Sequence, residues 1–403
     1  MTQQPSSAFQ VGSPVENCWI PATPRSMASQ MDSLSFQRTS ESARGGFATP
    51  YSASWDAGTL TGCIYRADGS KVLLSERHGG FKGDFLVSKN PDFVEKSDIS
   101  KEIPGRGLYL GNYMGGHYGH FITETLSTFW IFEQRKPEEF DYFLFHPYVF
   151  GIGIPDHVKI CFDRFGISSE KLLFVEGESL RLEEVLVPER LFRLNHSADA
   201  RLKWVYQHIA EGAPPPAAPC PRLYLSRRRF NKKTFDRVVA NEVEVEAEFS
   251  RRGFEVIYPE TMSFEDQVGR YCRAEWLAGM SGSGLHNSIF MNPEGAVIEL
   301  GDPRYGGERA PTQVLCDTIS GVRSTLIPFV GPRFGVRGTM LFNMRYMRTR
   351  LQEILGPVSE APRRGLIRWS IDALQVIYLA VRPSAGSVAR RVLRWFGVGG
   401  TSR

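Results

Sequence analysis

Two histidines and a glutamate lie close together in the chain, directly after the glycine-rich loop GNYMGG. The apolar pattern predicts a helix over residues 118–134. On such a helix His117, His120, Glu124 and Ser127 fall within about 80° of one another. Imidazole titrates near neutral pH and can take a proton from a hydroxyl, and Glu124, one turn from His120, could orient that ring. The pattern fits a general base, and the alternative is an exposed polar face on a core helix.

A second group of residues forms a glycine turn. Ser281, Gly282, Ser283 and Gly284 lie between an apolar strand and a short helix that we expect to begin near Leu285. Glycines let the backbone approach a ligand closely, and the N–H groups that open a helix suit an anionic group such as a diphosphate. The turn therefore indicates a phosphate cradle, with an ordinary tight turn as the alternative.

Four more polar residues lie near the ends of the elements around this turn. His286 and Asn287 follow it directly, where they could contact a ligand or simply cap the helix. Glu299 lies at the far end of the next strand, where open parallel sheets bind ligands, so its carboxylate could accept hydrogen bonds from ribose hydroxyls. Arg227 is the first of three arginines after another strand; it could clamp phosphates bidentately, or belong to a solvated loop.

The elements that must position these residues alternate between strand and helix patterns, which predicts open parallel sheets. The proline-rich stretch GAPPPAAPCP at residues 212–221 interrupts every periodicity and predicts a linker. We therefore expect a flexible N-terminal segment over 1–47, an α/β domain over 48–211, a second α/β domain over 222–335 and a helical, basic, amphipathic tail over 336–403.

The basic charge of the protein is concentrated in that tail. The whole chain has a formal net charge of +4, whereas residues 363–403 contain eight arginines and one acid, Asp372. Apolar residues recur there at helical spacing, with Trp and Phe among them. Such a helix could lie on an anionic membrane surface, or it could dock on the protein itself. The remainder of the chain is slightly acidic and the tail arginines form no continuous stripe, which argues against nucleic-acid binding.

Composition and cysteine spacing narrow the class further. The six cysteines are more than 40 residues apart, with no C-x-x-C pair and no histidine at zinc-ligand spacing, which fits reduced thiols. We find neither a signal peptide pattern nor an apolar run long enough to span a membrane. We expect a cytoplasmic protein, with peripheral attachment at the inner face of the membrane as an option through the tail.

Several blocks of sequence, in order and at the right spacing, resemble the family 61 glycosyltransferases, and in particular the bacterial members associated with capsular and other surface polysaccharides. These blocks span about half of the chain. They are GHYGH at 116–120, Ser-Arg at 226–227, Asn-Glu at 241–242, SFEDQ at 263–267 and GSGLHNSIFMNPEGAVIEL at 282–300.

This resemblance implies a GT-B architecture, in which two Rossmann-like domains face a cleft, and transfer with inversion at the anomeric carbon. It implies a nucleotide-sugar donor in the C-terminal domain, with Arg227 on the diphosphate and Glu299 on the ribose, and a glycan or lipid-linked glycan acceptor in the N-terminal domain. His117, His120 or Glu124 would deprotonate the acceptor hydroxyl. Many family members open the glycine loop with His-Gly where this chain has Ser281-Gly282, so no role of that histidine is carried over.

The chain contains no Asp-x-Asp motif of the kind that holds a divalent metal against a diphosphate. We therefore expect transfer without a metal or other cofactor, and activity that persists in EDTA. Two other functions fit the same residues. One is a non-catalytic glycan- or nucleotide-binding protein of a polysaccharide assembly complex, and the other is a different group transferase, for example of pyruvyl groups, on the same scaffold.

Overall fold

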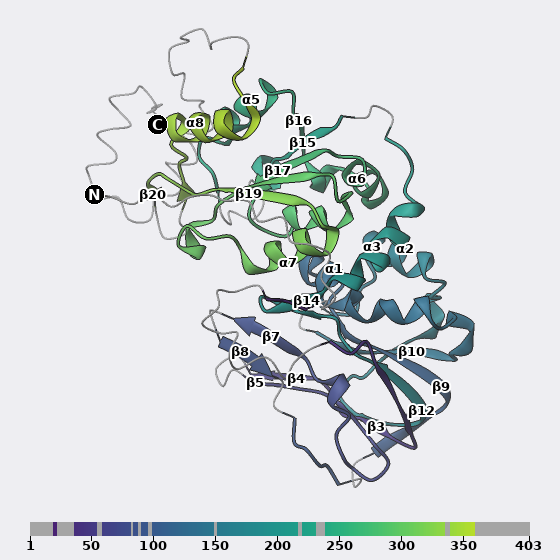
Figure 1. The fold of residues 1–403 in the computed structure, drawn as a ribbon. Coiled ribbons are helices and arrows are strands. Elements are labelled where there is room, and N and C mark those ends of the chain that lie inside the picture. Colours follow the sequence, from purple (N-terminus) through teal and green to yellow (C-terminus); the bar gives the residue numbers. More distant parts are fainter. Residues whose placement is uncertain are drawn as a thin grey trace, which may run out of the picture.

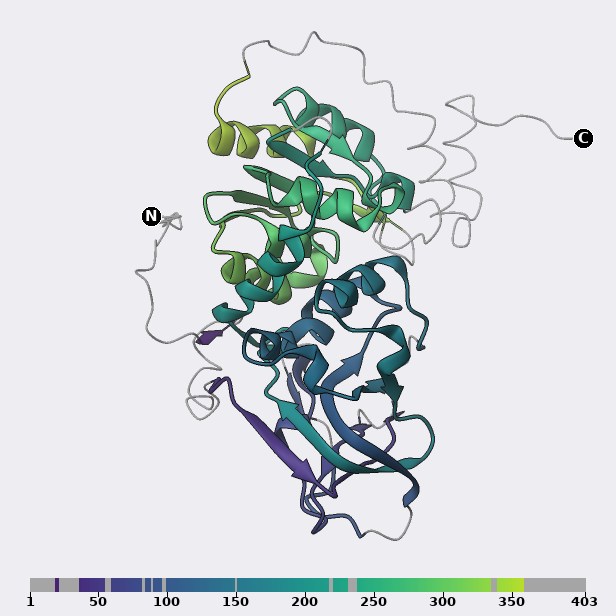
Figure 2. The same ribbon diagram turned by 90° about the vertical axis from the view of Figure 1, so that its right-hand side faces the viewer.

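The computed structural model describes residues 19–21, 36–54, 59–81, 84–87, 90–95, 99–148, 151–216, 220–230, 238–334 and 339–358. Two β-sheets dominate these residues, one built from each half of the chain (Figure 1). Helices α1, α2, α3 and α7 lie where the two halves meet, and a view at right angles shows the halves stacked along one long axis (Figure 2). The protein has a mixed α/β fold with parallel sheets and helices.

The first sheet has seven strands in the order β11-β10-β9-β12-β3-β6, with β2 also paired to β12. Neighbours among β11, β10, β9 and β12 run parallel, whereas β2, β3 and β6 are antiparallel to their neighbours. The bounds are β2 Ser40–Arg44, β3 Phe47–Ala48, β6 Ile64–Tyr65, β9 Ile99–Tyr113, β10 Tyr142–Pro147, β11 Leu172–Phe174 and β12 Ser179–Pro188.

Helical segments connect these strands. After β9 the chain enters the short α-helix α1 (Tyr118–Thr123) and continues as the 3-10 helix η4 (Thr125–Glu133). The single helix expected over residues 118–134 is thus divided at Glu124. The other segments of this half are η2 Leu73–Ser75, η5 Pro137–Glu139, α2 Asp156–Arg164, η6 Ser169–Lys171, η7 Ala200–Leu202 and α3 Lys203–Glu211.

The second sheet has five parallel strands in the order β16-β15-β17-β18-β19. The chain leaves β15 for β16 on one side and then crosses to β17 on the other, so the crossovers diverge between β15 and β17. Open α/β sheets bind ligands outside the carboxyl ends of the strands at such a point. The strands are β15 Arg222–Leu225, β16 Glu255–Ile257, β17 Trp276–Met280, β18 Ala296–Leu300 and β19 Arg323–Ile327.

Helices flank this sheet, and local sequence explains where they start. The helix α6 (Phe264–Tyr271) begins after Ser263, whose side chain accepts a hydrogen bond from the backbone N–H of Asp266, as a capping residue should. The other segments are α5 Glu242–Ser250, η8 Pro259–Thr261, η9 Leu285–Phe290, η10 Pro303–Tyr305, α7 Pro311–Ser320 and α8 Met344–Leu355.

The remaining strands form small sheets at the periphery. A three-stranded sheet has the order β1-β14-β13, and three pairs are β4-β5, β7-β8 and β20-β21. Their bounds are β1 Trp19–Pro21, β4 Ser52–Ser54, β5 Thr59–Thr61, β7 His78–Phe81, β8 Asp84–Val87, β13 Phe192–Arg193, β14 Ser197–Asp199, β20 Arg333–Phe334 and β21 Thr339–Met340.

One hydrophobic core runs through both halves of the protein. Phe121 and Phe162 from the first half belong to the same cluster of buried residues as Phe290 and Leu315 from the second. The ring of Tyr206 on α3 packs edge-on against Phe290, with centroids 5.7 Å apart. The predicted linker at 212–221 does fall between α3 and β15, but the described residues on its two sides share this core.

Two predicted boundaries are wrong. Residues 40–44, expected in a flexible segment, form β2 along β12, and Phe36 is buried beside them. Residues 339–355, expected in the tail, form β21 and α8, whose Met347 and Leu351 are buried in the core of the second sheet. The basic amphipathic stretch at 363–396 lies outside the described residues, as do residues 1–18 and 22–35.

Candidate functional site

The predicted histidine and glutamate pair comes together across the last turn of α1, where Glu124 is the C-cap. The His120 Nδ1 lies 2.6 Å from Glu124 Oε1, at the spacing of one helical turn. The His120 side chain is 25% exposed, whereas the Glu124 side chain is 4% exposed. The carboxylate is therefore inside the protein, and the imidazole that it holds faces outward.

Arg77, which no sequence pattern indicated, completes this arrangement. Its Nε and Nη2 donate to the two oxygens of Glu124 at 2.7 and 3.0 Å. Burial alone raises the pKa of Glu124, but the Arg77 charge and the His120 hydrogen bond outweigh it and hold the pKa well below its usual range. An ionised Glu124 can only accept, so His120 donates through Nδ1 and a neutral ring carries its lone pair on Nε2. This is the tautomer that a general base needs.

His117 and Ser127 lie on either side of this pair. The His117 ring is 4.4 Å from that of His120, measured between centroids, and its Nδ1 accepts from the His120 backbone N–H at 3.4 Å, which caps α1. Ser127 is fully buried, and its hydroxyl donates to the Glu124 carbonyl oxygen at 2.6 Å. Of the predicted polar face, His117 and His120 are therefore partly exposed, while Ser127 supports the helix internally.

The glycine turn follows β17, as the sequence predicted. Gly282 has a φ of 146°, a value that side chains with a Cβ rarely adopt. The next helix, η9, is a six-residue 3-10 helix, and the N–H groups of Leu285 and His286 bond back to the Gly282 carbonyl oxygen at 2.9 and 3.4 Å. An ideal Cβ placed on Gly284 would meet nothing within 4 Å. Open space therefore adjoins the backbone at Gly284.

Ser281 and Glu299 belong to a buried network below the turn. The Ser281 hydroxyl donates to Glu299 Oε1 at 2.6 Å, and Glu299 also accepts from Arg309 Nε at 2.8 Å and from the Ala310 N–H at 3.1 Å. Glu299 is fully buried, and Arg309 also pairs with Asp317. In this conformation Glu299 joins β17, β18 and the start of α7. Its contact with ribose remains a prediction.

His286 and Asn287 are also buried and bonded to protein. The His286 Nδ1 lies 2.8 Å from Gln313 Oε1 on α7. The Asn287 amide donates to the Gly284 carbonyl oxygen at 2.9 Å, and its oxygen accepts a hydrogen bond from the Tyr118 hydroxyl of α1. Asn287 therefore links the glycine turn to α1, the helix that contains His120. The two bonded residues, Tyr118 and Asn287, lie 169 residues apart in the sequence.

The two predicted sites meet directly at Gly119. An ideal Cβ on Gly119 would lie 2.5 Å from Ser283 Oγ and 2.9 Å from Ser283 Cβ, which is closer than real Cβ atoms approach. The first turn of α1 and the loop after β17 are therefore in van der Waals contact because position 119 has no side chain. This contact brings the base candidate of one half beside the phosphate-cradle candidate of the other.

Arg227 lies at the carboxyl end of β15, next to the point where the crossovers diverge. Its backbone N–H donates to Glu242 Oε1 at 2.6 Å, and its guanidinium carbon lies 5.0 Å from the centre of the Phe230 ring. Glu242 is 2% exposed, and its second oxygen has no hydrogen-bond partner among the described residues. Burial and the neighbouring charge of Glu246 raise the pKa of Glu242 to about 7. Glu242 therefore anchors the backbone of the predicted phosphate-binding arginine.

Within the residues that the structure describes, no three His, Cys, Asp or Glu side chains gather closely enough to hold a metal ion. None of the helices in the same part of the chain is both long and apolar enough to cross a bilayer.

The described residues form an α/β protein in which a histidine oriented by Glu124 lies close to the glycine turn that follows the carboxyl end of β17. Residues 118–298 match the family model of glycosyltransferase 61, a region that runs from the start of α1 into β18. The match covers somewhat less than half of the chain, and it includes His120, Glu124 and Arg227. A search of curated proteins found no match. The family match supports a glycosyltransferase, and so glycosyl transfer, for this protein.

Proposed function

We propose that the protein is an inverting glycosyltransferase of the GT-B type that moves a sugar from a nucleotide-sugar donor to a glycan acceptor in surface or capsular polysaccharide biosynthesis. The observation that carries this proposal is the contact of Gly119 with Ser283. It brings the helix that carries His120, the base that we propose, close to a turn with open space at Gly284. Both lie at the edge of the second sheet where ligands bind in such folds.

In the proposed reaction His120 acts as the base. The acceptor hydroxyl, whose pKa lies far above neutrality, loses its proton to His120 Nε2 while its oxygen attacks the anomeric carbon. Glu124 and Arg77 keep the ring in the required tautomer and stabilise the imidazolium that forms. The bond from the anomeric carbon to the diphosphate oxygen breaks on the opposite face, so the configuration inverts.

The leaving nucleoside diphosphate gains negative charge that fixed donors must stabilise. We assign this role to the Arg227 guanidinium and to the backbone of residues 281–284, and we propose that neither a metal ion nor another cofactor is needed. The acceptor, a glycan or a lipid-linked glycan, would occupy the side of His117 and His120. We further propose a cytoplasmic location, with the arginine-rich stretch at 363–396 on the inner face of an anionic membrane.

Thermal unfolding in the presence of nucleotide sugars tests this proposal. A ligand at 100 times its dissociation constant adds about 2.7 kcal/mol of stability, a shift of a few degrees. We expect one class among UDP, GDP and CMP sugars to give that shift, with or without EDTA. Arg227→Ala should abolish the shift. Arg323→Ala, an exposed arginine at the opposite, amino end of β19, should leave it unchanged.

Gly284→Ala provides a sharper test of where the phosphates lie. Gly284 has helical backbone angles, with φ −63° and ψ −41°, and no atom would contact the new methyl group. The variant should therefore fold with unchanged or slightly higher stability, yet bind the donor about tenfold more weakly because the methyl group fills the space given to the diphosphate. Unchanged donor affinity in this variant, or a shift that needs added manganese or magnesium, would contradict the assignment.

A further inference from the structure

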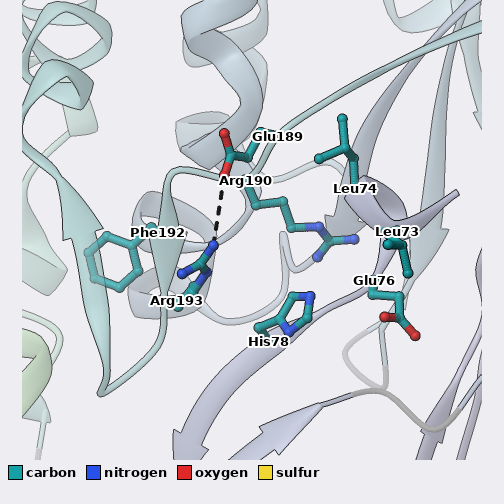
Figure 3. Close-up of a pocket in the computed structure, with 8 residues that line it drawn as sticks. All are labelled: Leu73, Leu74, Glu76, His78, Glu189, Arg190, Phe192 and Arg193. Carbon is teal, nitrogen blue, oxygen red and sulfur yellow. Dashed lines mark ion pairs between the residues drawn. The ribbon is translucent and has the colours of Figure 1, made fainter. Parts of the chain in front are cut away.

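A cavity of about 50 Å³ lies in the first half of the protein, away from the glycine turn. It is bounded by η2, by the start of β7 and by the segment that follows β12 (Figure 3). A single water molecule needs roughly 10–15 Å³ of such volume, so the cavity has room for a larger group. The polar residues of its lining are Glu76, His78, Glu189, Arg190 and Arg193. Leu73 lies at its mouth.

Arg190 is the most unusual residue of this lining. It is 7% exposed, and its guanidinium donates to Asn112 Oδ1 at 2.7 Å, to the Ser75 carbonyl oxygen at 3.0 Å and to the Tyr109 hydroxyl at 3.0 Å. All three acceptors are neutral, and Nε has no hydrogen-bond partner among the residues that the structure describes. None of the carboxylates in the described part of the chain forms an ion pair with Arg190. A buried charge without a counter-charge is costly, and proteins generally pair such groups.

The two acids of the lining do not neutralise Arg190, because each is engaged elsewhere. Glu76 pairs with Lys71 at 3.0 Å. Glu189 accepts hydrogen bonds from the backbone N–H groups of residues 37 and 38 at 2.9 and 2.8 Å, and it lies 3.7 Å from Arg193, the ion pair drawn in Figure 3. Within the lining, Arg190 is therefore the charge that neither acid pairs with.

His78 lines the cavity together with Arg190 and Arg193. Burial, followed by the charges of Arg193 and Arg190, lowers the pKa of His78 to about 3, so the imidazole is neutral at physiological pH. A neutral imidazole and a guanidinium together offer hydrogen-bond donors of the kind that bind carboxylates and phosphates. Leu73, which is 63% exposed, lines the same cavity, so the cavity reaches the surface there.

We propose that this cavity binds one small oxyanion group, a carboxylate or a phosphate, carried by the acceptor substrate, with Arg190 as its counter-charge. The link to the acceptor rests on the proposed function. Arg77, which holds Glu124, immediately precedes His78 of the cavity. Asn112, which binds Arg190, accepts at its backbone carbonyl oxygen from Thr125, the residue after Glu124. The base and the oxyanion subsite are thus built on shared segments of the first half.

Direct binding tests the subsite without any need for transfer activity. The probes are inorganic phosphate and glucuronate, compared with glucose and with sodium chloride at equal ionic strength, and the readout is saturable thermal stabilisation. We expect at least one of the two anions to stabilise the protein, and Arg190→Gln to weaken its binding by roughly tenfold or more. Arg44→Gln, which changes an arginine whose side chain is 82% exposed, should bind as the wild type does.

A second variant guards against loss of folding in Arg190→Gln. Leu73→Trp changes an exposed residue at the mouth and narrows the cavity without touching the Arg190 hydrogen bonds, so it should also weaken anion binding. Phosphate could also bind at the proposed donor site, and Arg227→Ala removes that contribution. Stabilisation by phosphate that comes from the cavity should therefore persist in Arg227→Ala. Equal anion affinity in Leu73→Trp and wild type, or no specific stabilisation by either anion, would overturn the proposal.

The two anions distinguish the source of the group. Preference for glucuronate identifies an acidic sugar of the acceptor, and preference for phosphate identifies a phosphorylated one. Failure of this inference is also separable from failure of the proposed function. If the protein binds a nucleotide sugar but shows no Arg190-dependent anion binding, only the subsite proposal is contradicted. If it shows Arg190-dependent anion binding but binds no nucleotide sugar, only the proposed transfer reaction is contradicted.

Discussion

Glu242 makes the stability of this protein dependent on pH in a direction opposite to that of most carboxylates. Its pKa is raised from the ordinary 4.5 to about 7, first by burial and then by the charge of Glu246. Between these two pH values the folded protein keeps a proton that the unfolded chain has released. Stability therefore falls as the pH rises through this interval. The shift corresponds to about 3 kcal/mol, fully expressed above pH 7.

Glu242→Gln removes this titration. It keeps a side-chain oxygen that can accept from the Arg227 N–H, as the carboxylate does at 2.6 Å in the wild type. Urea unfolding of both proteins at pH 5, 6, 7 and 8 measures the effect. We expect similar stabilities at pH 5, and at pH 8 a variant that exceeds the wild type by up to about 3 kcal/mol. Glu244→Gln, on the same helix but partly exposed, is the control. Curves for Glu242→Gln and wild type that stay parallel across the range would refute the reasoning.

Three further predictions concern the base and its contact with the glycine turn. Arg77→Met should cost about 3–5 kcal/mol, because it leaves Glu124 buried without its partner; urea unfolding at pH 7 measures the loss, and a loss below 1 kcal/mol would contradict it. Glu124→Gln should reduce acid sensitivity, because the lowered pKa of Glu124 contributes stability that is present above pH 4.5 and lost as the pH falls through the folded-state value. Acid titration followed by circular dichroism checks this, and an unchanged acid midpoint would count against it. Gly119→Ala should destabilise the protein by about 1–3 kcal/mol, because its Cβ would overlap Ser283, and Ser283→Gly in the same chain should restore most of the loss.

The second half of the fold was predictable because its signals are local. The strand predicted to carry Glu299 at its far end is β18, and the glycine turn is where Gly282 and Gly284 indicated it. The start of α6 likewise follows from the side chain of Ser263, which accepts from a backbone N–H three residues later. Each of these features depends on residues within one or two turns of each other, where periodicity and backbone preference decide the structure.

The two boundary errors, at β2 and at α8, have different causes. The strand β2 has the sequence SESAR and buries only Ala43, so its sequence shows no apolar alternation. It is a strand because it pairs antiparallel with β12, which is distant in sequence. The helix α8 was expected in a tail, although Met344, Met347 and Leu351 have helical spacing and are buried against the second half. Their apolar spacing was the available signal, and the charged residues between them obscured it.

Side-chain partners distant in sequence were equally hidden. Arg77 lies 47 residues before Glu124, and no motif relates the two. Glu299 was predicted at the correct end of its strand, but Arg309 from a later loop covers its carboxylate. The contact of Gly119 with Ser283 also depends on tertiary packing. The sequence therefore indicated candidate residues for the chemistry, whereas their electrostatic partners had to come from the structure.

The most direct test of the central claim is the rate at which His120→Ala releases nucleoside diphosphate from the selected donor in the presence of a glycan acceptor mixture. Loss of a general base typically costs 10²–10⁴-fold in rate, and the donor affinity of the variant should stay within about twofold of wild type because we assign His120 to the acceptor and not to the donor. A rate loss of that size with intact donor binding is the predicted result. A rate equal to that of the wild type would contradict the account and exclude His120 as the base.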